Sequence, residues 1–239
     1  MTKLTGGQAV VKTLEVEGAE VAYGILGSHC MPTFDALADS SIRLIVPRCE
    51  DAAGHMADAY TRVSNNPGVV LTTVGPGACG VASAMGEAYN ESWPMMHIST
   101  QIMTQYMGKE KGMYHDGPNQ KDMFKPVSSW QHTVTSAGEI PEAINEGYRR
   151  MRTGRPRPVF IEIPSDVLIN EDDIKILPRA NVTPPPIKES ELKDALDLIK
   201  KSKRPLLWFG GGTVKANAMA EVKQLAVMLQ APLPCTNGS

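Results

Sequence analysis

The stretch IRLIVPRCEDAAGHMADAYTR, residues 42–62, joins a short apolar run to an amphipathic one. The first five residues are mostly β-branched or aliphatic, which predicts a strand over Ile42–Val46 that ends at Pro47. Apolar residues then recur at helical spacing, which predicts a helix over Glu50–Val63. Because α/β proteins bind ligands just beyond the carboxyl ends of their strands, Glu50 is a candidate site residue.

A carboxylate at this position also has a simpler explanation. Negative side chains in the first turn of a helix gain about 0.3–1 kcal/mol from the helix dipole, and Asp51 fits that role. Glu50 therefore needs support from its surroundings before it is assigned a function.

The alternation of short apolar runs and amphipathic stretches continues along the chain. Predicted strands are Val21–Ile25, Ile42–Val46, Val69–Thr73, Met95–Ser99, Ser128–His132 and Val159–Ile163, and predicted helices are Gly6–Glu17, Thr33–Ala38, Glu50–Val63, Cys79–Tyr89 and Ile140–Arg152. Such alternation gives parallel strands joined by right-handed crossovers. The predicted fold class is α/β, a doubly wound parallel sheet with helices on both faces, over residues 1–169.

A proline-rich linker is predicted over residues 170–188, which include the run Pro184–Pro186. Consecutive prolines are extended and incompatible with a helix or a central strand. A helix over Glu189–Lys201, a strand over Leu206–Phe209 and a helix over Ala216–Leu229 then begin a second, Rossmann-like α/β pattern. Since one strand–helix–strand unit leaves its sheet uncovered, we expect residues 189–239 to be an incomplete central domain. The sequence is thus expected to be a fragment of a longer polypeptide.

The composition is ordinary for a globular protein, with 42% hydrophobic and 21% charged residues and a net charge of −2 in 239 residues. This near-neutral balance argues against nucleic acid or an anionic membrane as a partner. The sequence shows no apolar run of membrane-spanning length and no signal peptide at its start. Its four cysteines form no Cys-x-x-Cys pair, which predicts free thiols and a cytoplasmic location.

Two glycine-rich turns are candidate binding loops. Residues 75–80, Gly-Pro-Gly-Ala-Cys-Gly, fit the G-x-G-x-x-G pattern of dinucleotide-binding turns between a strand and a helix. No acidic residue ends the following strand, however, and Pro76 removes an amide that would otherwise be available to a phosphate. Gly210–Gly212 occupies a similar turn. A nucleotide-binding, non-lyase α/β module therefore remains a distant alternative.

Histidine and cysteine neighbours do not predict a metal site. The pairs His29/Cys30 and Cys49/His55 lack the ligand spacing of a strong zinc motif, and local hydrogen bonding is the favoured interpretation.

Taken together, the motifs resemble those of one family. The chain resembles the pyrimidine-binding domain of thiamin-diphosphate-dependent enzymes, in particular the acetolactate synthase-like group, over almost its whole length. The matching segments are Gly24–Gly27 (similar to G-I-P-G), Glu50 with Ala52–Asp58, Thr73–Gly77 (similar to T-S-G-P-G), Glu91–Pro94, Asn119–Gln120, Phe124–Val127 and Pro158–Val167.

The resemblance implies roles for particular residues. It implies that Glu50 binds N1′ of the cofactor aminopyrimidine and favours the imino tautomer that accepts the proton from C2 of the thiazolium. The residues implied to bind the cofactor are Gly27, Glu50, Thr73, Gly75, Pro76 and Gly77. His115 is a candidate acid or base on the substrate side, and an exposed loop histidine is an equally good interpretation.

The same resemblance implies a 2-keto acid substrate, thiamin diphosphate with Mg²⁺ as cofactor, FAD in some members, and a homodimer or tetramer with a shared active site. The implied activity is that of a decarboxylating lyase or carboligase, and a simple 2-keto acid decarboxylase is the nearest alternative.

Some residues depart from the family pattern. Leu26 stands where proline is usual, Val74 replaces serine, Gly80 replaces asparagine, and His115-Asp116-Gly117 replaces Phe-Gln-Glu. The diphosphate- and metal-binding segment, G-D-G followed later by asparagine, does not occur in this sequence. The family holds the two ends of the cofactor on different subunits, so the fragment is expected to carry half a site and to be inactive alone.

Overall fold

The computed structural model describes residues 2–117, 119–183 and 185–238, so that Pro184 of the proline run lies outside the described residues. The chain divides into two compact units, Met1–Val182 and Thr183–Ser239. The expected first domain, residues 1–169, lies within the first unit, and the expected linker, residues 170–188, is divided between the two.

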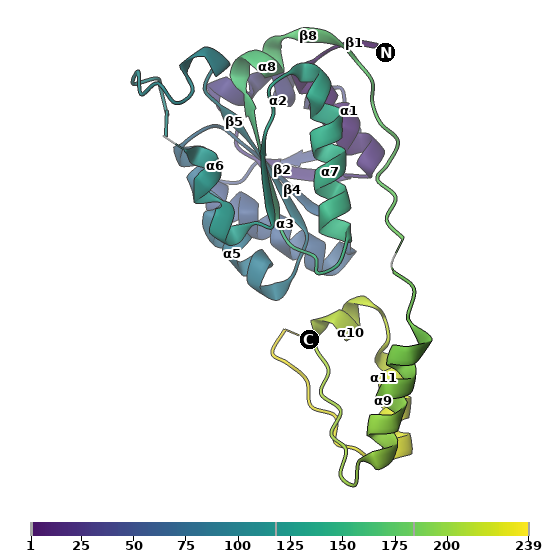
Figure 1. The fold of residues 1–239 in the computed structure, drawn as a ribbon. Coiled ribbons are helices and arrows are strands. Elements are labelled where there is room, and N and C mark those ends of the chain that lie inside the picture. Colours follow the sequence, from purple (N-terminus) through teal and green to yellow (C-terminus); the bar gives the residue numbers. More distant parts are fainter. Residues whose placement is uncertain (1, 118, 184, 239) are drawn as a thin grey trace. The chain divides into compact units, whose positions relative to one another are not determined.

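The first unit alternates strands and helices (Figure 1). Its strands are β1 (Thr2–Thr5), β2 (Val21–Gly24), β3 (Arg43–Ile45), β4 (Gly68–Thr72), β5 (Met95–Gln101), β6 (Trp130–Thr133), β7 (Val159–Pro164) and β8 (Glu171–Ile174). Its α-helices are α1 (Gly6–Glu17), α2 (Met31–Ala38), α3 (Glu50–Ser64), α4 (Pro76–Gly80), α5 (Ala82–Glu91), α6 (Gln120–Met123), α7 (Ile140–Arg152) and α8 (Ser165–Ile169). Single 3-10 turns are η1 (Ser28–Cys30), η2 (Thr104–Tyr106), η3 (Lys125–Val127) and η4 (Ala137–Glu139).

Helix α1 illustrates how local sequence sets these bounds. Thr5 accepts a hydrogen bond from the Gln8 amide, and the Gln8 side chain accepts one from the Thr5 amide, which forms a capping box. The helix ends at Gly18, whose φ of 88° is in the left-handed region that glycine adopts without strain.

Six parallel strands form the main sheet in the order β3-β2-β4-β5-β7-β6. Strands β3 and β4 both follow β2 in the chain, yet they lie on opposite sides of it. The crossovers from β2 and from β3 therefore run in opposite directions, and in doubly wound sheets such a reversal marks the place, here the carboxyl ends of β2 and β4, where a ligand-binding crevice is expected.

Helices cover both faces of this sheet (Figure 1). Alternate residues of one strand serve the two cores: Val69 and Leu71 pack with α1, α2 and α7, whereas Val70 packs with α3 and α5. The predicted α/β fold class, with a parallel sheet between two helical layers, is confirmed.

The structure adds an antiparallel pair that was not predicted. Strand β1 pairs with β8, with Thr2 opposite Ile174. The residues after β8 are also fastened to the first unit, because the buried carboxylate of Glu17 accepts hydrogen bonds from the Ala180 amide (2.8 Å) and from Asn145 (2.9 Å) and forms an ion pair with Arg152 (3.0 Å). Composition alone does not reveal this arrangement, since Glu171, Asp172 and Asp173 are poor strand formers.

His97 lies at the centre of the sheet and carries a testable pH dependence. Burial lowers the pKa of His97 to about 3, while its Nε2 lies 2.9 Å from the Thr72 hydroxyl. An unfolded histidine titrates near about pH 6.5, so between these two values the unfolded chain binds a proton that the native chain does not. Stability should therefore fall as the pH decreases from about 6.5 towards 3, by up to about 1.4 kcal/mol per pH unit.

The measurement is urea unfolding of the wild type and of His97→Gln at pH 7 and at pH 5. We expect the wild type to lose about 1–2 kcal/mol more than the variant, because the variant lacks the titrating ring. Equal losses in the two proteins would contradict this assignment.

The second unit contains α9 (Glu189–Lys201), α10 (Gly211–Lys215) and α11 (Met219–Leu229). The strand expected over Leu206–Phe209 is present only as an isolated parallel bridge between Phe209 and Cys235. The helix expected from Ala216 begins later, at Met219, because Asn217 takes a left-handed φ of 53° and separates α10 from α11.

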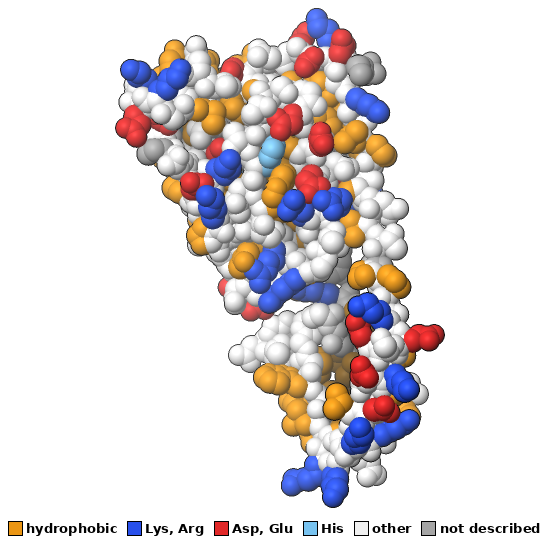
Figure 2. All heavy atoms as spheres, viewed as in Figure 1, with side chains coloured by type: hydrophobic (Ala, Val, Ile, Leu, Met, Phe, Trp, Pro, Cys, Tyr) orange, Lys and Arg blue, Asp and Glu red, His pale blue; other side chains and the backbone are white. Residues whose placement is uncertain are grey.

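Acidic and basic side chains are mixed across the face drawn in Figure 2, in keeping with the net charge of −2. Within the described residues, every helix is too short or too polar to cross a bilayer.

Candidate functional site

The candidate site lies in the crevice at the carboxyl ends of β2 and β4. Three segments reach it: residues 25–30 after β2, Glu50 after β3, and residues 73–77 after β4. Because β3, β2 and β4 are neighbours in the sheet, the residues predicted to bind the cofactor come together at the carboxyl-terminal end of these strands. They are Gly27, Glu50, Thr73, Gly75, Pro76 and Gly77.

Glu50 is the first residue of α3 and is half-buried. Its Oε1 lies 3.3 Å from the place where a side chain on Gly77 would begin, and its Cβ lies 2.9 Å from the corresponding place on Gly80. Both glycines are therefore needed for the start of α3 to approach α4 this closely. Among the described residues, the Glu50 carboxylate has neither a hydrogen-bond donor nor an ion-pair partner, which distinguishes it from the neighbouring Asp51, bound to Ser83 and His55.

Thr73 packs directly against Gly27 at the carboxyl ends of β4 and β2. A side chain on Gly27 would begin 2.7 Å from the Cβ of Thr73, and one on Gly77 would begin 2.7 Å from its Cγ2. The hydroxyl of Thr73 is buried and has no hydrogen-bond partner among the described residues. Thr73 therefore presents an unsatisfied polar atom between two glycines, which is a feature expected where a ligand completes the bonding.

The Gly27 turn is fastened by a thiol. The Gly27 amide donates to the Sγ of Cys30 (3.2 Å), and that thiol lies 3.3 Å from the Gly27 carbonyl oxygen, which accepts from it. Burial, together with the nearby charge of Glu50, raises the pKa of the Cys30 thiol. Cys30 is thus a neutral thiol that holds the turn, in agreement with the local hydrogen bonding expected for it.

Gly75 adopts φ 63° and ψ −114°, a conformation open only to glycine. A side chain there would begin 2.3 Å from the carbonyl oxygen of His115, so His115 packs directly on this loop. The Gly75 amide donates to the Oε1 of Gln120 at 2.7 Å. Since this amide is engaged inside the protein, it is not available to a phosphate, which weakens the dinucleotide alternative. Pro76 follows as the exposed first residue of α4.

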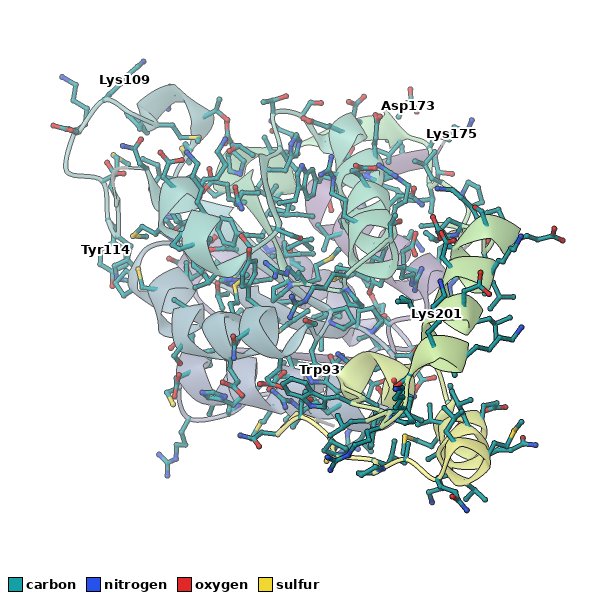
Figure 3. The ribbon with its side chains drawn as sticks, turned by 60° about the horizontal axis from the view of Figure 1, so that its bottom comes forward. Trp93, Lys109, Tyr114, Asp173, Lys175 and Lys201 are labelled. Carbon is teal, nitrogen blue, oxygen red and sulfur yellow. The ribbon has the colours of Figure 1, made fainter. Side chains whose placement is uncertain are left out.

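His115 reaches the site through its backbone and through stacked rings. It takes a left-handed φ of 64°, and its buried Nδ1 has no hydrogen-bond partner among the described residues. Its ring stacks on Tyr114 with centroids 3.8 Å apart, and the Tyr114 ring is also nearly parallel to that of His29, 6.4 Å away. Tyr114 lies at the margin of the unit on the long connection after β5 (Figure 3).

From sequence, His29 is only a poor candidate metal ligand, whereas the structure places it close enough to His115 for the two rings to interact electrostatically. Burial and the proximity of His115 lower the pKa of His29. The signal available in sequence was its position two residues after Gly27, in the turn that follows β2.

Replacing His115 with glutamine is expected to raise the pKa of His29, because it removes a neighbouring group that becomes positive on protonation. The measurement is an NMR titration of the imidazole signals in the wild type, in His115→Gln and in the control His55→Gln, which changes an exposed histidine on α3. An unchanged His29 pKa in His115→Gln would show that the two rings do not interact.

Residues 4–123 match the family described as "Thiamine pyrophosphate enzyme, N-terminal TPP binding domain". The chain belongs to this family, and the family predicted from the motifs is confirmed.

Among curated relatives, the chain is 34% identical to a probable acetolactate synthase large subunit of Methanocaldococcus jannaschii, over 98% of this chain and 40% of that protein. It is 36% identical to a probable 2-ketoarginine decarboxylase AruI of Pseudomonas aeruginosa, over 96% of this chain and 41% of that protein. It is 32% identical to the acetolactate synthase isozyme 1 large subunit of Escherichia coli, over 98% of this chain and 41% of that protein. The chain thus spans about two fifths of the length of these relatives.

The residues at the crevice fit the aminopyrimidine end of thiamin diphosphate. Among the described residues, the Glu50 carboxylate and the Thr73 hydroxyl have no hydrogen-bond partner, and two glycines that add no side chain, Gly27 and Gly77, pack beside them. Such a set suits a flat, nitrogen-rich ring that both donates and accepts hydrogen bonds.

Proposed function

We propose that this chain is the N-terminal part of a thiamin-diphosphate-dependent 2-keto acid lyase or carboligase of the acetolactate synthase type. The observation that carries the proposal is the Glu50 carboxylate, which faces Gly77 at the carboxyl ends of β2 and β4 and has no hydrogen-bond or ion-pair partner among the described residues. The family of the chain and the names of its relatives support the same activity.

Each proposed site residue has a distinct task. Glu50 holds a proton at N1′ of the aminopyrimidine, and Thr73 supplies a hydroxyl to the same ring. Gly27, Gly75, Pro76 and Gly77 form the surrounding wall and leave room for the ring, because their turns carry little side-chain bulk. When bound, thiamin diphosphate supplies a nucleophilic carbon and an electron sink for the loss of carbon dioxide from a 2-keto acid.

His115 is proposed as an acid or base on the substrate side. Support comes from its contact with Gly75 and from its buried Nδ1, which has no partner among the described residues. Histidine is the side chain that most often serves as a general acid or base in catalysis.

The remaining parts of the holoenzyme are proposed from the family. The diphosphate and Mg²⁺ are held by a segment outside this sequence, on a partner subunit of a homodimer or tetramer. The second unit is proposed as the beginning of the central domain, where FAD binds in some members. A cytoplasmic location is proposed because Cys30, Cys49, Cys79 and Cys235 are free thiols.

A simple 2-keto acid decarboxylase is the second candidate function. The similarity to a probable 2-ketoarginine decarboxylase favours it specifically. The two candidates share the Glu50 site and differ in whether a second keto acid is joined to the first after carbon dioxide leaves.

The test uses the longer polypeptide that contains this chain. We expect it to release carbon dioxide from a panel of 2-keto acids only when thiamin diphosphate and Mg²⁺ are both present. Product analysis distinguishes the two candidates. Simple decarboxylation gives an aldehyde, whereas carboligation gives a longer hydroxyketo acid. No carbon dioxide from any keto acid, with the cofactor demonstrably bound, would contradict the proposal.

A further inference from the structure

A polar pocket of about 200 Å³ lies beside the glycine loop, at the carboxyl ends of β5, β6 and β7. Gln101 and Thr133 line it from the ends of β5 and β6, and Glu162 lines it from β7. Gln120 joins the pocket to the candidate site. Its Oε1 accepts a hydrogen bond from the Gly75 amide, and its Nε2 donates a hydrogen bond to Glu162 (3.2 Å).

The floor of the pocket is built from buried polar groups. Glu162 is 3% exposed, Gln101 5% and Gln120 0%. The two Glu162 oxygens accept hydrogen bonds from Gln101 (3.3 Å), Gln120 (3.2 Å) and the Thr133 hydroxyl (2.7 Å). All of these donors are neutral, and within the described residues Glu162 has no ion-pair partner. A buried carboxylate normally has a counter-charge, so the charge of Glu162 is left uncompensated on a surface that faces a cavity.

The walls add to this negative potential. Asp116 and Asp122 contribute two further carboxylates, of which Asp122 forms an ion pair with Lys125 (2.8 Å), and Lys121 is the one cation that lines the pocket among the described residues. The described residues contain no group of three or more His, Cys, Asp or Glu side chains that could converge on a metal ion. Dispersed carboxylates and amide oxygens around 200 Å³ suit a larger organic cation with several donors instead.

We propose that this pocket is a subsite for a guanidinium or alkylammonium group at the far end of the substrate side chain. The inference rests on the proposed function, in which the near end of a 2-keto acid reacts beside the Gly75 loop. The wall of the pocket begins at Asp116, the residue next to His115, whose carbonyl oxygen contacts that loop. The pocket thus adjoins the loop that carries His115.

The experiment measures binding of two nearly isosteric probes, butylguanidinium and butylurea, to the 239-residue chain by NMR titration or calorimetry. We expect butylguanidinium to bind at least about tenfold more tightly, since a hydrogen bond to a charged group contributes more than one between neutral groups. Glu162→Gln and Asp116→Asn should each reduce the preference for the cation by about fivefold or more, whereas the surface control Glu171→Gln should not.

Lys121→Met supplies the opposite change. Removing the competing ammonium group should tighten binding of butylguanidinium and leave butylurea unaffected. Asp116→Asn keeps the test decisive if Glu162→Gln does not fold, because Asp116 lies on a loop outside the buried floor.

Equal affinity for the two probes, or a preference that survives in Asp116→Asn and in every folded Glu162 variant, would overturn the subsite. Failure of the proposed function shows itself separately, as absence of carbon dioxide release. Glu50→Gln should leave binding of either probe unchanged, because Glu50 does not line the pocket.

Discussion

Replacing Glu50 with glutamine is expected to lower the rate of 2-keto acid decarboxylation by the longer polypeptide about 10²–10⁴-fold, the usual range for loss of a proton-transfer group. The amide retains the size of the side chain but cannot hold a proton at a ring nitrogen. Stability should change little, by less than about 1 kcal/mol, because within the described part of the chain the carboxylate has no bonded partner to lose and only its favourable interaction with the helix dipole is removed. The measurements are steady-state rates at saturating cofactor and the unfolding midpoint of the chain.

Asp51→Asn provides the matched control, because Asp51 is the next residue in the same helical turn. Its carboxylate is bound to Ser83 and lies 3.7 Å from the Nε2 of His55. The substitution therefore removes a charge that interacts with the same helix dipole, and it leaves the residues of the crevice unchanged. We expect nearly full activity from this variant. Equal and mild effects of the two substitutions would return Glu50 to the role of a helix-dipole partner.

Replacing Gly75 with alanine is expected to destabilise the first unit by about 2–5 kcal/mol. Alanine is strained at φ 63° and ψ −114°, and its Cβ would meet the His115 carbonyl oxygen at 2.3 Å. Relief of that contact requires the loop carrying His115 to move, so the hydrogen bond from Gly75 to Gln120 should weaken as well. Unfolding in urea, followed through NMR signals of the first unit, measures the change.

Gly86→Ala is the control for this prediction. Gly86 lies within α5, and an added Cβ there would make only an ordinary contact of 3.5 Å with Val127. Alanine at this position should be neutral or should stabilise the protein by up to about 1 kcal/mol, because glycine is a poor helix former. A Gly75 variant as stable as the Gly86 variant would be incompatible with the tight contact to His115.

The parallel sheet could be predicted from sequence because its strands carry a strong local signal. Runs such as Val69–Thr72 are apolar on both faces, and each is followed by an amphipathic stretch of helical length. Element boundaries differ from the prediction where the local signal is weak: β6 begins at Trp130 rather than Ser128, and the helix expected over Cys79–Tyr89 divides at Val81 into α4 and α5. Helix α4 begins at Pro76, directly after the constrained Gly75, and so starts earlier than the predicted helix.

The polar architecture around the crevice could be predicted only in part. Glu50 and the glycines closely follow strands, so the order of elements predicts that they lie together at the carboxyl-terminal ends of the strands. The contact of His115 with Gly75, the stacking of His29 with Tyr114, and the bridge from Gln120 to Glu162 join residues distant in sequence. No local periodicity encodes such pairs, because each depends on how the loop after β5 folds back over the sheet.

The carboxylate of Glu17 has a practical consequence for where the first unit can be cut. It gathers α1, α7 and the segment around Ala180 into one bonded cluster. A truncated protein ending at Ile169 would lose β8, leave β1 as an unpaired edge, and strip Glu17 of the Ala180 amide while it remains buried. Residues 170–180, which resemble a flexible linker by composition, are thus bonded to the first unit. A protease that cleaves the linker should therefore cut on the carboxyl-terminal side of residue 180 while the bonds to Glu17 are intact.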